Sequence, residues 1–107
     1  DILDVDQKRV EALREFNLQQ QKRTLLVLGG SLGARTINES ISANLALLAE
    51  AGVQVIWQTG KMYIESVKAQ VAGQDLAPFR IYDFIKRMDL AYAASDVVIS
   101  RAGALAI

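Results

Sequence analysis

A glycine-rich run after an apolar segment is the part of this sequence best suited to bind an anion. The run is Gly29-Gly30-Ser31-Leu32-Gly33-Ala34, and it follows the apolar residues Thr24-Leu25-Leu26-Val27-Leu28. Glycine permits positive φ and close approach of the backbone to a ligand, and a helix that starts here offers unpaired N–H groups to phosphate. Ser31 suits either a helix cap or a hydroxyl contact to phosphate. A purely structural strand-to-helix turn has the same pattern, so phosphate binding is a hypothesis at this point.

A second glycine-bearing turn strengthens the hypothesis. Val97-Val98-Ile99 is followed by Ser100-Arg101-Ala102-Gly103. Arg101 comes immediately after the strand predicted here and is a candidate for contact with an anion, since guanidinium groups bind phosphate well. Residues 103–107 are predicted to form the first turn of a helix, which would add a second helix N-terminus.

Familiar nucleotide-binding motifs fit less well. A Walker loop needs a Gly-Lys-Ser/Thr ending, but Gly33 is followed by Ala34 and Arg35. The dinucleotide fingerprint needs three glycines and an acidic residue after the second strand, and Leu28 and Trp57-Gln58-Thr59 stand at those positions. Nicotinamide or flavin binding by an oxidoreductase domain is therefore an alternative, and a non-catalytic α/β interaction module is another.

Composition narrows the chemistry. The chain has no Cys and no His, which removes thiolates and the commonest general base. Asp4-Val5-Asp6 matches the Asp-x-Asp metal pattern of some glycosyltransferases, but acidic residues also suit a helix start, and no metal or cofactor is expected. Twelve basic residues balance twelve acidic ones, which argues against nucleic acid as a partner. No apolar run approaches the roughly 20 residues of a membrane helix.

Apolar periodicity predicts the elements that must position these turns. Strands are predicted at 24–28, 53–57, 79–84 and 96–100, and helices at 6–16, from 34 to the cap at Gly52, from about 61 to the cap at Gly73, and at 88–94. Alternation of strands with helices predicts an α/β fold: a Rossmann-like parallel sheet with helices on both faces. A strand order of 3-2-1-4 would bring both glycine turns to one crevice. The chain would then cross the sheet through residues 84–88.

We expect a single unit over 1–107, with a leading helix and linker at 1–23 and four βα units at 24–107 that end at the start of a helix. The chain begins at Asp1 without an initiator Met. It is therefore predicted to be a piece of a longer protein.

Four motifs, taken in order, resemble one family of bacterial enzymes. They are residues 25–35, Trp57-Gln58-Thr59-Gly60, Phe84-Ile85 with Met88, and residues 100–105. Together they are similar to the MurG-type N-acetylglucosaminyltransferases. That family transfers N-acetylglucosamine from UDP-N-acetylglucosamine to undecaprenyl-diphospho-muramoylpentapeptide in peptidoglycan synthesis. The resemblance implies the opening part of the C-terminal, donor-binding half of a GT-B fold.

The resemblance also implies roles for particular residues. Ser31 would contact the donor phosphate, Phe84 and Ile85 would lie against uracil, and residues 104–107 would lie along the diphosphate and sugar. The full set of expected donor-binding residues is Gly30, Ser31, Phe84, Ile85, Met88, Arg101, Ala104, Leu105, Ala106 and Ile107. No catalytic residue is expected within the chain.

Some departures from the family pattern limit what the chain itself should do. The family usually has Thr where Ala106 stands, and its ribose-binding Glu is expected beyond Ile107. The acceptor-binding domain is expected in a separate N-terminal part. The intact enzyme would be an inverting hexosyltransferase, peripheral on the cytoplasmic face of the inner membrane, whereas this chain is predicted to bind UDP weakly and not to turn over.

Overall fold

The structure is a computed structural model that describes residues 2–30, 34–100 and 103–106, with the backbone alone described at 2–5 and 104. Ten elements follow one another along these residues. They are α1 (Ile2–Glu15), β1 (Arg23–Leu28), α2 (Ala34–Ala43), α3 (Leu45–Glu50), β2 (Val53–Gln58), α4 (Ile64–Val71), β3 (Phe79–Tyr82), α5 (Met88–Ala94), β4 (Val97–Ser100) and β5 (Gly103–Ala106).

The strands form one five-stranded sheet in the order β3-β2-β1-β4-β5. β1 pairs in parallel with β2 and with β4, so that Val27 is level with Trp57 on one side and with Ile99 on the other. β2 and β3 are also parallel. The predicted α/β class and the predicted order of the first four strands are both confirmed. This order places the carboxyl ends of β1 and β4 side by side.

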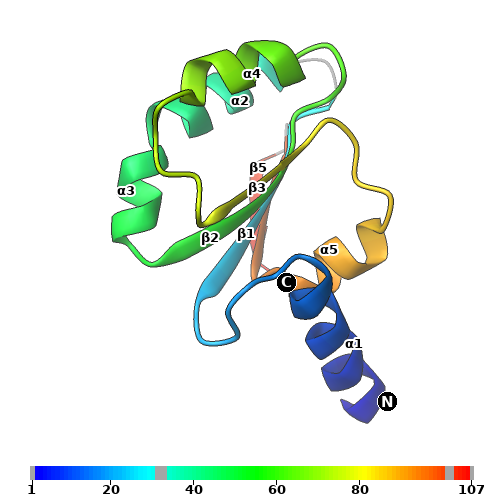
Figure 1. The fold of residues 1–107 in the computed structure, drawn as a ribbon. Helices are drawn as coiled ribbons and strands as arrows, with labels where there is room; N and C mark the ends of the chain where they lie inside the picture. The colour runs from blue at the N-terminus through cyan, green and yellow to red at the C-terminus, as the bar shows by residue number, and fades with distance from the viewer. Residues whose placement is uncertain (1, 31–33, 101–102, 107) are drawn as a thin grey trace.

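Helices cover both faces of the sheet, as Figure 1 shows. On one face α1 and α5 pack on Leu26 and Ile56, and Ile85 joins this cluster. On the other face α2, α3 and α4 pack on a second apolar cluster, to which β1 supplies Val27 and β2 supplies Trp57. Because side chains alternate along a strand, each buried strand supplies apolar residues to both clusters. Within the described residues, no helix combines the length and the apolar character needed to cross a membrane.

The long helix predicted from residue 34 to Gly52 is two helices in the structure. The helical path breaks at Asn44, which has φ −122° and ψ 20°. Its side-chain Nδ2 donates to the Ser40 carbonyl at 2.7 Å. Asn competes with the helical backbone through such local bonds, which explains the break between α2 and α3. The predicted cap is confirmed, because Gly52 follows α3 with φ 74°.

The helix predicted to begin at residue 103 is wrong. Residues Gly103–Ala106 form β5, which pairs antiparallel with β4. Gly103 has φ 122°, a conformation that glycine adopts readily, and this lets the chain reverse direction. A single helical turn makes few hydrogen bonds and nucleates poorly, whereas β5 completes a ladder along the whole of β4. The apolar edge of β4 is therefore covered.

Arg80 on β3 fastens the end of α1 to the sheet. Its guanidinium donates to the carbonyl oxygens of Phe16 and Asn17, each at 2.8 Å, and to that of Ala77 at 2.6 Å. Asn17 has a positive φ of 53° at this turn, which Asn tolerates better than most residues. One side chain thus satisfies carbonyl groups left over at the C-terminus of α1.

Replacing Arg80 with methionine is expected to lower the free energy of unfolding by about 1.5–3 kcal/mol, the range for hydrogen bonds to a charged group. Arg35→Met is the matched control, because Arg35 pairs with Glu39 on an exposed helix surface. Such an exposed pair contributes little to stability, so Arg35→Met should lose much less than Arg80→Met. Urea denaturation followed by circular dichroism measures both variants, and equal losses would contradict the role given to Arg80.

Candidate functional site

The two glycine turns lie at the same edge of the sheet. Gly29 and Gly30 follow β1, and Ser100 ends β4, its immediate neighbour, before Gly103 begins β5. The register that pairs Val27 with Ile99 brings both turns to the same level. Ser31 and Arg101, which were predicted to face an anion here, lie outside the described residues. The adjacent carboxyl ends of β1 and β4 therefore support the prediction that a crevice lies between them.

A third turn, after β2, touches the first. The Gly29 N–H donates to the Gln58 carbonyl at 2.7 Å. Gly60 has φ 86°, and a Cβ placed on it would lie 2.9 Å from the Gly30 Cα. Only glycine fits at this contact, because any side chain would meet backbone. The close approach fixes the position of Gly30.

A buried polar network supports these turns from the α2 side. The Asn38 side chain is 2% exposed and its Oδ1 accepts a hydrogen bond from the Trp57 indole N–H at 2.9 Å. Its Nδ2 donates to the Thr59 carbonyl at 3.1 Å. Both ends of the amide are therefore satisfied, as a buried polar group requires. Sequence reasoning missed Asn38, although a polar residue within the apolar stripe of Ile37 and Ile41 was a signal that could have revealed it.

The segment that crosses from β3 towards α5 is attached to the turn after β2. The Thr59 and Gly60 N–H groups donate to the carbonyls of Tyr82 and Asp83 at 2.8 and 3.0 Å. Beyond Asp83, the Ile85 N–H donates to the Gln58 side-chain Oε1 at 2.9 Å. The crossing segment therefore passes beside the glycine turns, as the predicted strand order requires.

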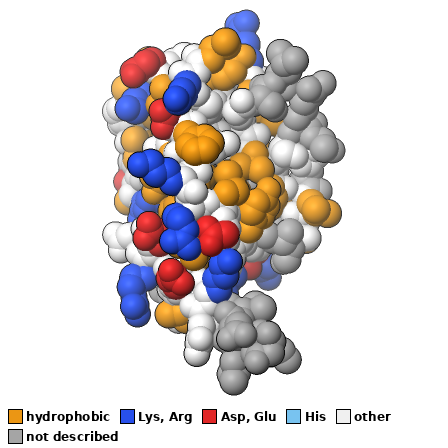
Figure 2. Space-filling model, turned by 90° about the vertical axis from the view of Figure 1, so that its right-hand side faces the viewer, with side chains coloured by type: hydrophobic (Ala, Val, Ile, Leu, Met, Phe, Trp, Pro, Cys, Tyr) orange, Lys and Arg blue, Asp and Glu red, His pale blue; other side chains and the backbone are white. Residues whose placement is uncertain are grey.

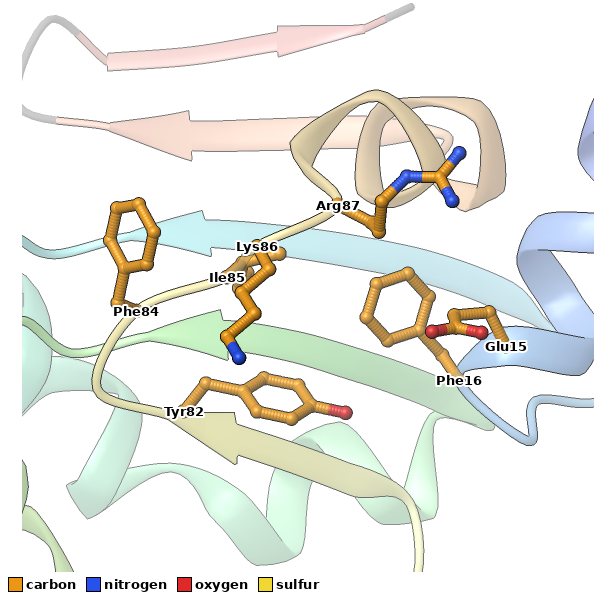
Figure 3. Close-up of a pocket in the computed structure, with 7 residues that line it drawn as sticks. All are labelled: Glu15, Phe16, Tyr82, Phe84, Ile85, Lys86 and Arg87. Carbon is orange, nitrogen blue, oxygen red and sulfur yellow. The ribbon is translucent and has the colours of Figure 1, made fainter.

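A cavity of about 240 Å³ opens along this crossing segment (Figure 3). Its lining residues are Glu15, Phe16, Tyr82, Phe84, Ile85, Lys86 and Arg87. Figure 2 shows that hydrophobic side chains gather in the middle of the face that carries α5, beside basic and acidic ones. The cavity is smaller than the roughly 300–1,000 Å³ of sites that enclose a whole drug-sized ligand. It suits one planar ring of a larger ligand.

Arg87, one of the charged residues that line this cavity, is held by an ion pair. Arg87 makes a two-pronged contact with Asp89, at 3.0 Å from Nε and from a terminal nitrogen. These hydrogen bonds hold the pKa of Asp89 well below its ordinary value, so its carboxylate stays ionised and is only a weak base near neutral pH. Lys8 adds a further ion pair to Asp89 at 3.4 Å. Burial raises the pKa of the Tyr82 phenol, which therefore remains protonated near neutral pH.

The remaining predicted site residues fall into two groups. Phe84 is 61% exposed and Ile85 4% exposed, and Met88 is half-buried at the start of α5. These three lie together on the crossing segment. Ala104, Leu105 and Ala106 instead run along β4, away from the carboxyl edge, with Leu105 68% exposed. Ile107 lies outside the described residues.

Metal binding has little support within the part of the chain that the structure describes. No group of three or more His, Cys, Asp or Glu side chains comes together there. Asp4 and Asp6 belong to α1, whose N-terminal end lies far from the carboxyl edge of the sheet (Figure 1). The Asp-x-Asp pattern is thus remote from the glycine turns.

The fold and the site define a class of protein: a Rossmann-like α/β domain with glycine turns and an apolar crossing segment gathered at one edge of the sheet. Within this class, the chain belongs to the glycosyltransferase family 28 C-terminal domains, whose family model matches residues 24–107.

Individual relatives agree with this family. The chain is 54% identical over 104 residues to the "UDP-N-acetylglucosamine--N-acetylmuramyl-(pentapeptide) pyrophosphoryl-undecaprenol N-acetylglucosamine transferase" of Christiangramia forsetii, covering 97% of this chain and 27% of that protein. It is 48% identical over 107 residues to the protein of the same name from Flavobacterium psychrophilum, covering 100% and 28%. The crystal structure of Acinetobacter baumannii MurG is similar with a TM-score of 0.63 and 32% identity, covering 86% of this chain and 26% of that one.

These findings confirm the resemblance to MurG-type glycosyltransferases and the fold that it implied. They favour a glycosyltransferase over the nicotinamide or flavin alternative. The chain spans about a quarter of the length of the curated relatives that it matches, 27% of the first and 28% of the second.

Proposed function

We propose that this chain binds the UDP-N-acetylglucosamine donor within a glycosyltransferase that transfers N-acetylglucosamine to undecaprenyl-diphospho-muramoylpentapeptide during peptidoglycan synthesis. One observation carries the proposal. The turns after β1 and β2 and the Phe84–Ile85 segment, which together span more than fifty residues of sequence, are held at one edge of the sheet by backbone and side-chain hydrogen bonds. The names of the relatives supply the donor and the acceptor.

Donor binding follows from this arrangement. The diphosphate lies against the backbone of Gly30 and at the N-terminus of α2, where the helix dipole favours negative charge. Ser31 and Arg101 add polar contacts to it. The uracil ring lies along the crossing segment, against the exposed ring of Phe84 and near Ile85 and Met88. Contacts from residues 104–107 to the diphosphate and sugar remain predictions, because β5 directs Ala104 to Ala106 along β4.

The chemistry proposed for the full-length protein is a single inverting displacement at the anomeric carbon. The acceptor hydroxyl forms the new bond while the bond to UDP breaks, and a base removes the hydroxyl proton. The present chain contributes the site of the departing diphosphate, where oriented N–H groups stabilise the growing negative charge. We assign the base and the acceptor site to other parts of the protein. The membrane-bound acceptor implies peripheral attachment to the inner face of the membrane.

Titration of the ¹⁵N-labelled chain with UDP tests the donor proposal. We expect amide shifts at Gly30 and Ile85, and none of comparable size with NAD. Phe84→Ala should weaken UDP binding roughly 2- to 13-fold, the effect of losing one aromatic contact. Tyr92→Ala is the matched control, because Tyr92 is another exposed aromatic side chain, 44% exposed on α5. Equal effects of the two substitutions, or shifts with NAD alone, would contradict the proposal.

A further inference from the structure

We infer that Gln58 is a positioning residue that fastens the crossing segment to the glycine turn after β1. In doing so it sets the separation between the base-binding and phosphate-binding ends of the donor site. This inference rests on the proposed function, and it assigns a role to a side chain that sequence reasoning had used only as part of a motif.

Gln58 contacts both ends of the proposed site. Its backbone carbonyl accepts the Gly29 N–H at 2.7 Å, and its side-chain Oε1 accepts the Ile85 N–H at 2.9 Å. Its Nε2 lies beside Gly30, where a Cβ would come within 3.3 Å of it. A single residue therefore contacts the proposed phosphate turn and the proposed uracil segment.

The crossing segment depends on this contact because it has left the sheet. β3 ends at Tyr82, and the last backbone bonds to the turn after β2 reach Tyr82 and Asp83. The Phe84 N–H donates to the side chain of Asp83, its own neighbour, which does not join the segment to the sheet. The bond from Ile85 to Gln58 spans 27 positions of sequence. It is the polar contact that holds the backbone beside Phe84 in place, while the buried Ile85 side chain supplies an apolar anchor.

Gln54 provides a comparison within the same strand. Gln54 and Gln58 are four residues apart on β2, so their side chains share a face of the sheet. The Gln54 Nε2 donates to the Gln19 carbonyl at 2.7 Å and to the Thr24 hydroxyl at 3.0 Å. Those partners lie at the opposite, amino end of the strands. Removing the Gln54 amide therefore perturbs the same strand without touching either glycine turn.

The experiment compares Gln58→Met, Gln58→Glu and Gln54→Met in the ¹⁵N-labelled chain. Gln58→Met removes the acceptor and should speed hydrogen exchange at the Ile85 amide and weaken uridine and UDP binding, each roughly 2- to 13-fold. Gln58→Glu keeps an acceptor oxygen, so exchange and uridine binding should return to within about twofold of the unaltered chain. UDP binding should remain weak in this variant, because the new carboxylate repels the diphosphate. Gln54→Met should leave Ile85 exchange and both affinities unchanged.

Several outcomes would overturn the inference. Failure of Gln58→Glu to restore Ile85 protection, or equal loss of uridine affinity in the Gln58→Met and Gln54→Met variants, would show that Gln58 acts only through general stability. A through-hydrogen-bond coupling between the Ile85 nitrogen and the Gln58 side-chain carbonyl, measured in the unaltered chain, tests the contact even if a variant fails to fold. Its absence would also overturn the inference. Absence of any UDP response in the unaltered chain would instead contradict the proposed function, while Ile85 exchange would still decide the contact.

Discussion

Replacing Trp57 with alanine is expected to remove about 3–5 kcal/mol from the free energy of unfolding, the range for loss of a large buried aromatic side chain. Trp57 is fully buried in the cluster between the sheet and the helices α2, α3 and α4. A single domain has only about 5–15 kcal/mol of stability in total. The variant should therefore be largely unfolded at moderate urea concentrations. Circular dichroism measures the transition without depending on the tryptophan signal.

Two further variants separate the causes of that loss. Trp57→Phe keeps most of the apolar volume but removes the indole N–H, leaving the Asn38 oxygen without this donor. It should cost about 1–3 kcal/mol, the range for an unsatisfied buried polar group. Leu47→Ala is the surface control, because Leu47 is 63% exposed, and it should stay within about 0.5 kcal/mol. A Trp57→Ala variant as stable as Leu47→Ala would contradict the described core.

Gly60→Ala is expected to be more damaging than Gly52→Ala, although both glycines have positive φ, 86° and 74°. At Gly52 nothing lies within 4 Å of an added Cβ, whereas at Gly60 the Cβ would meet the Gly30 Cα at 2.9 Å. Both variants should lose about 1–2 kcal/mol for the left-handed backbone. Gly60→Ala should lose about 1–3 kcal/mol more, because backbone must move to relieve the overlap.

The displaced backbone gives Gly60→Ala a functional signature as well. Because Gly30 belongs to the proposed phosphate turn, Gly60→Ala should weaken UDP binding even at temperatures where the chain remains folded. Gly52→Ala should leave UDP binding intact, since Gly52 lies at the far end of β2. Urea denaturation and UDP titration of the two variants measure both effects. Equal unfolding free energies for the pair would rule out the close contact between the turns.

Much of the fold could be predicted because its signals are local. The run at 24–28 is almost wholly apolar and the run at 53–57 is apolar apart from Gln54, which is typical of central parallel strands, and they became β1 and β2. Gly73 ended its helix as predicted, with φ 83°. Right-handed crossovers then leave few possible strand orders. The predicted 3-2-1-4 order therefore needed no information about tertiary contacts.

Other features depend on contacts that periodicity does not reveal. The break at Asn44 comes from a side-chain bond that competes with the helix, and β5 forms because the edge of β4 is available for pairing. At the candidate site, the glycines were visible in the sequence as conformational signals. The roles of Asn38 and Gln58 were not, since each depends on a partner 19 to 27 positions away.

The last two residues of β2 affect how this domain can change during evolution. Trp57 points towards α2 and α4, and Gln58 points to the opposite side, towards the crossing segment. The helices on the two faces of the sheet belong to separate apolar clusters. Each face is nevertheless connected to the glycine turns by one of two adjacent residues of β2, Trp57 on one face and Gln58 on the other. A change of side-chain packing on either face of the sheet therefore shifts the same peptide groups at the end of β2. Sequence drift in one layer is tolerated only within limits set by the other, even where no atoms of the two layers touch.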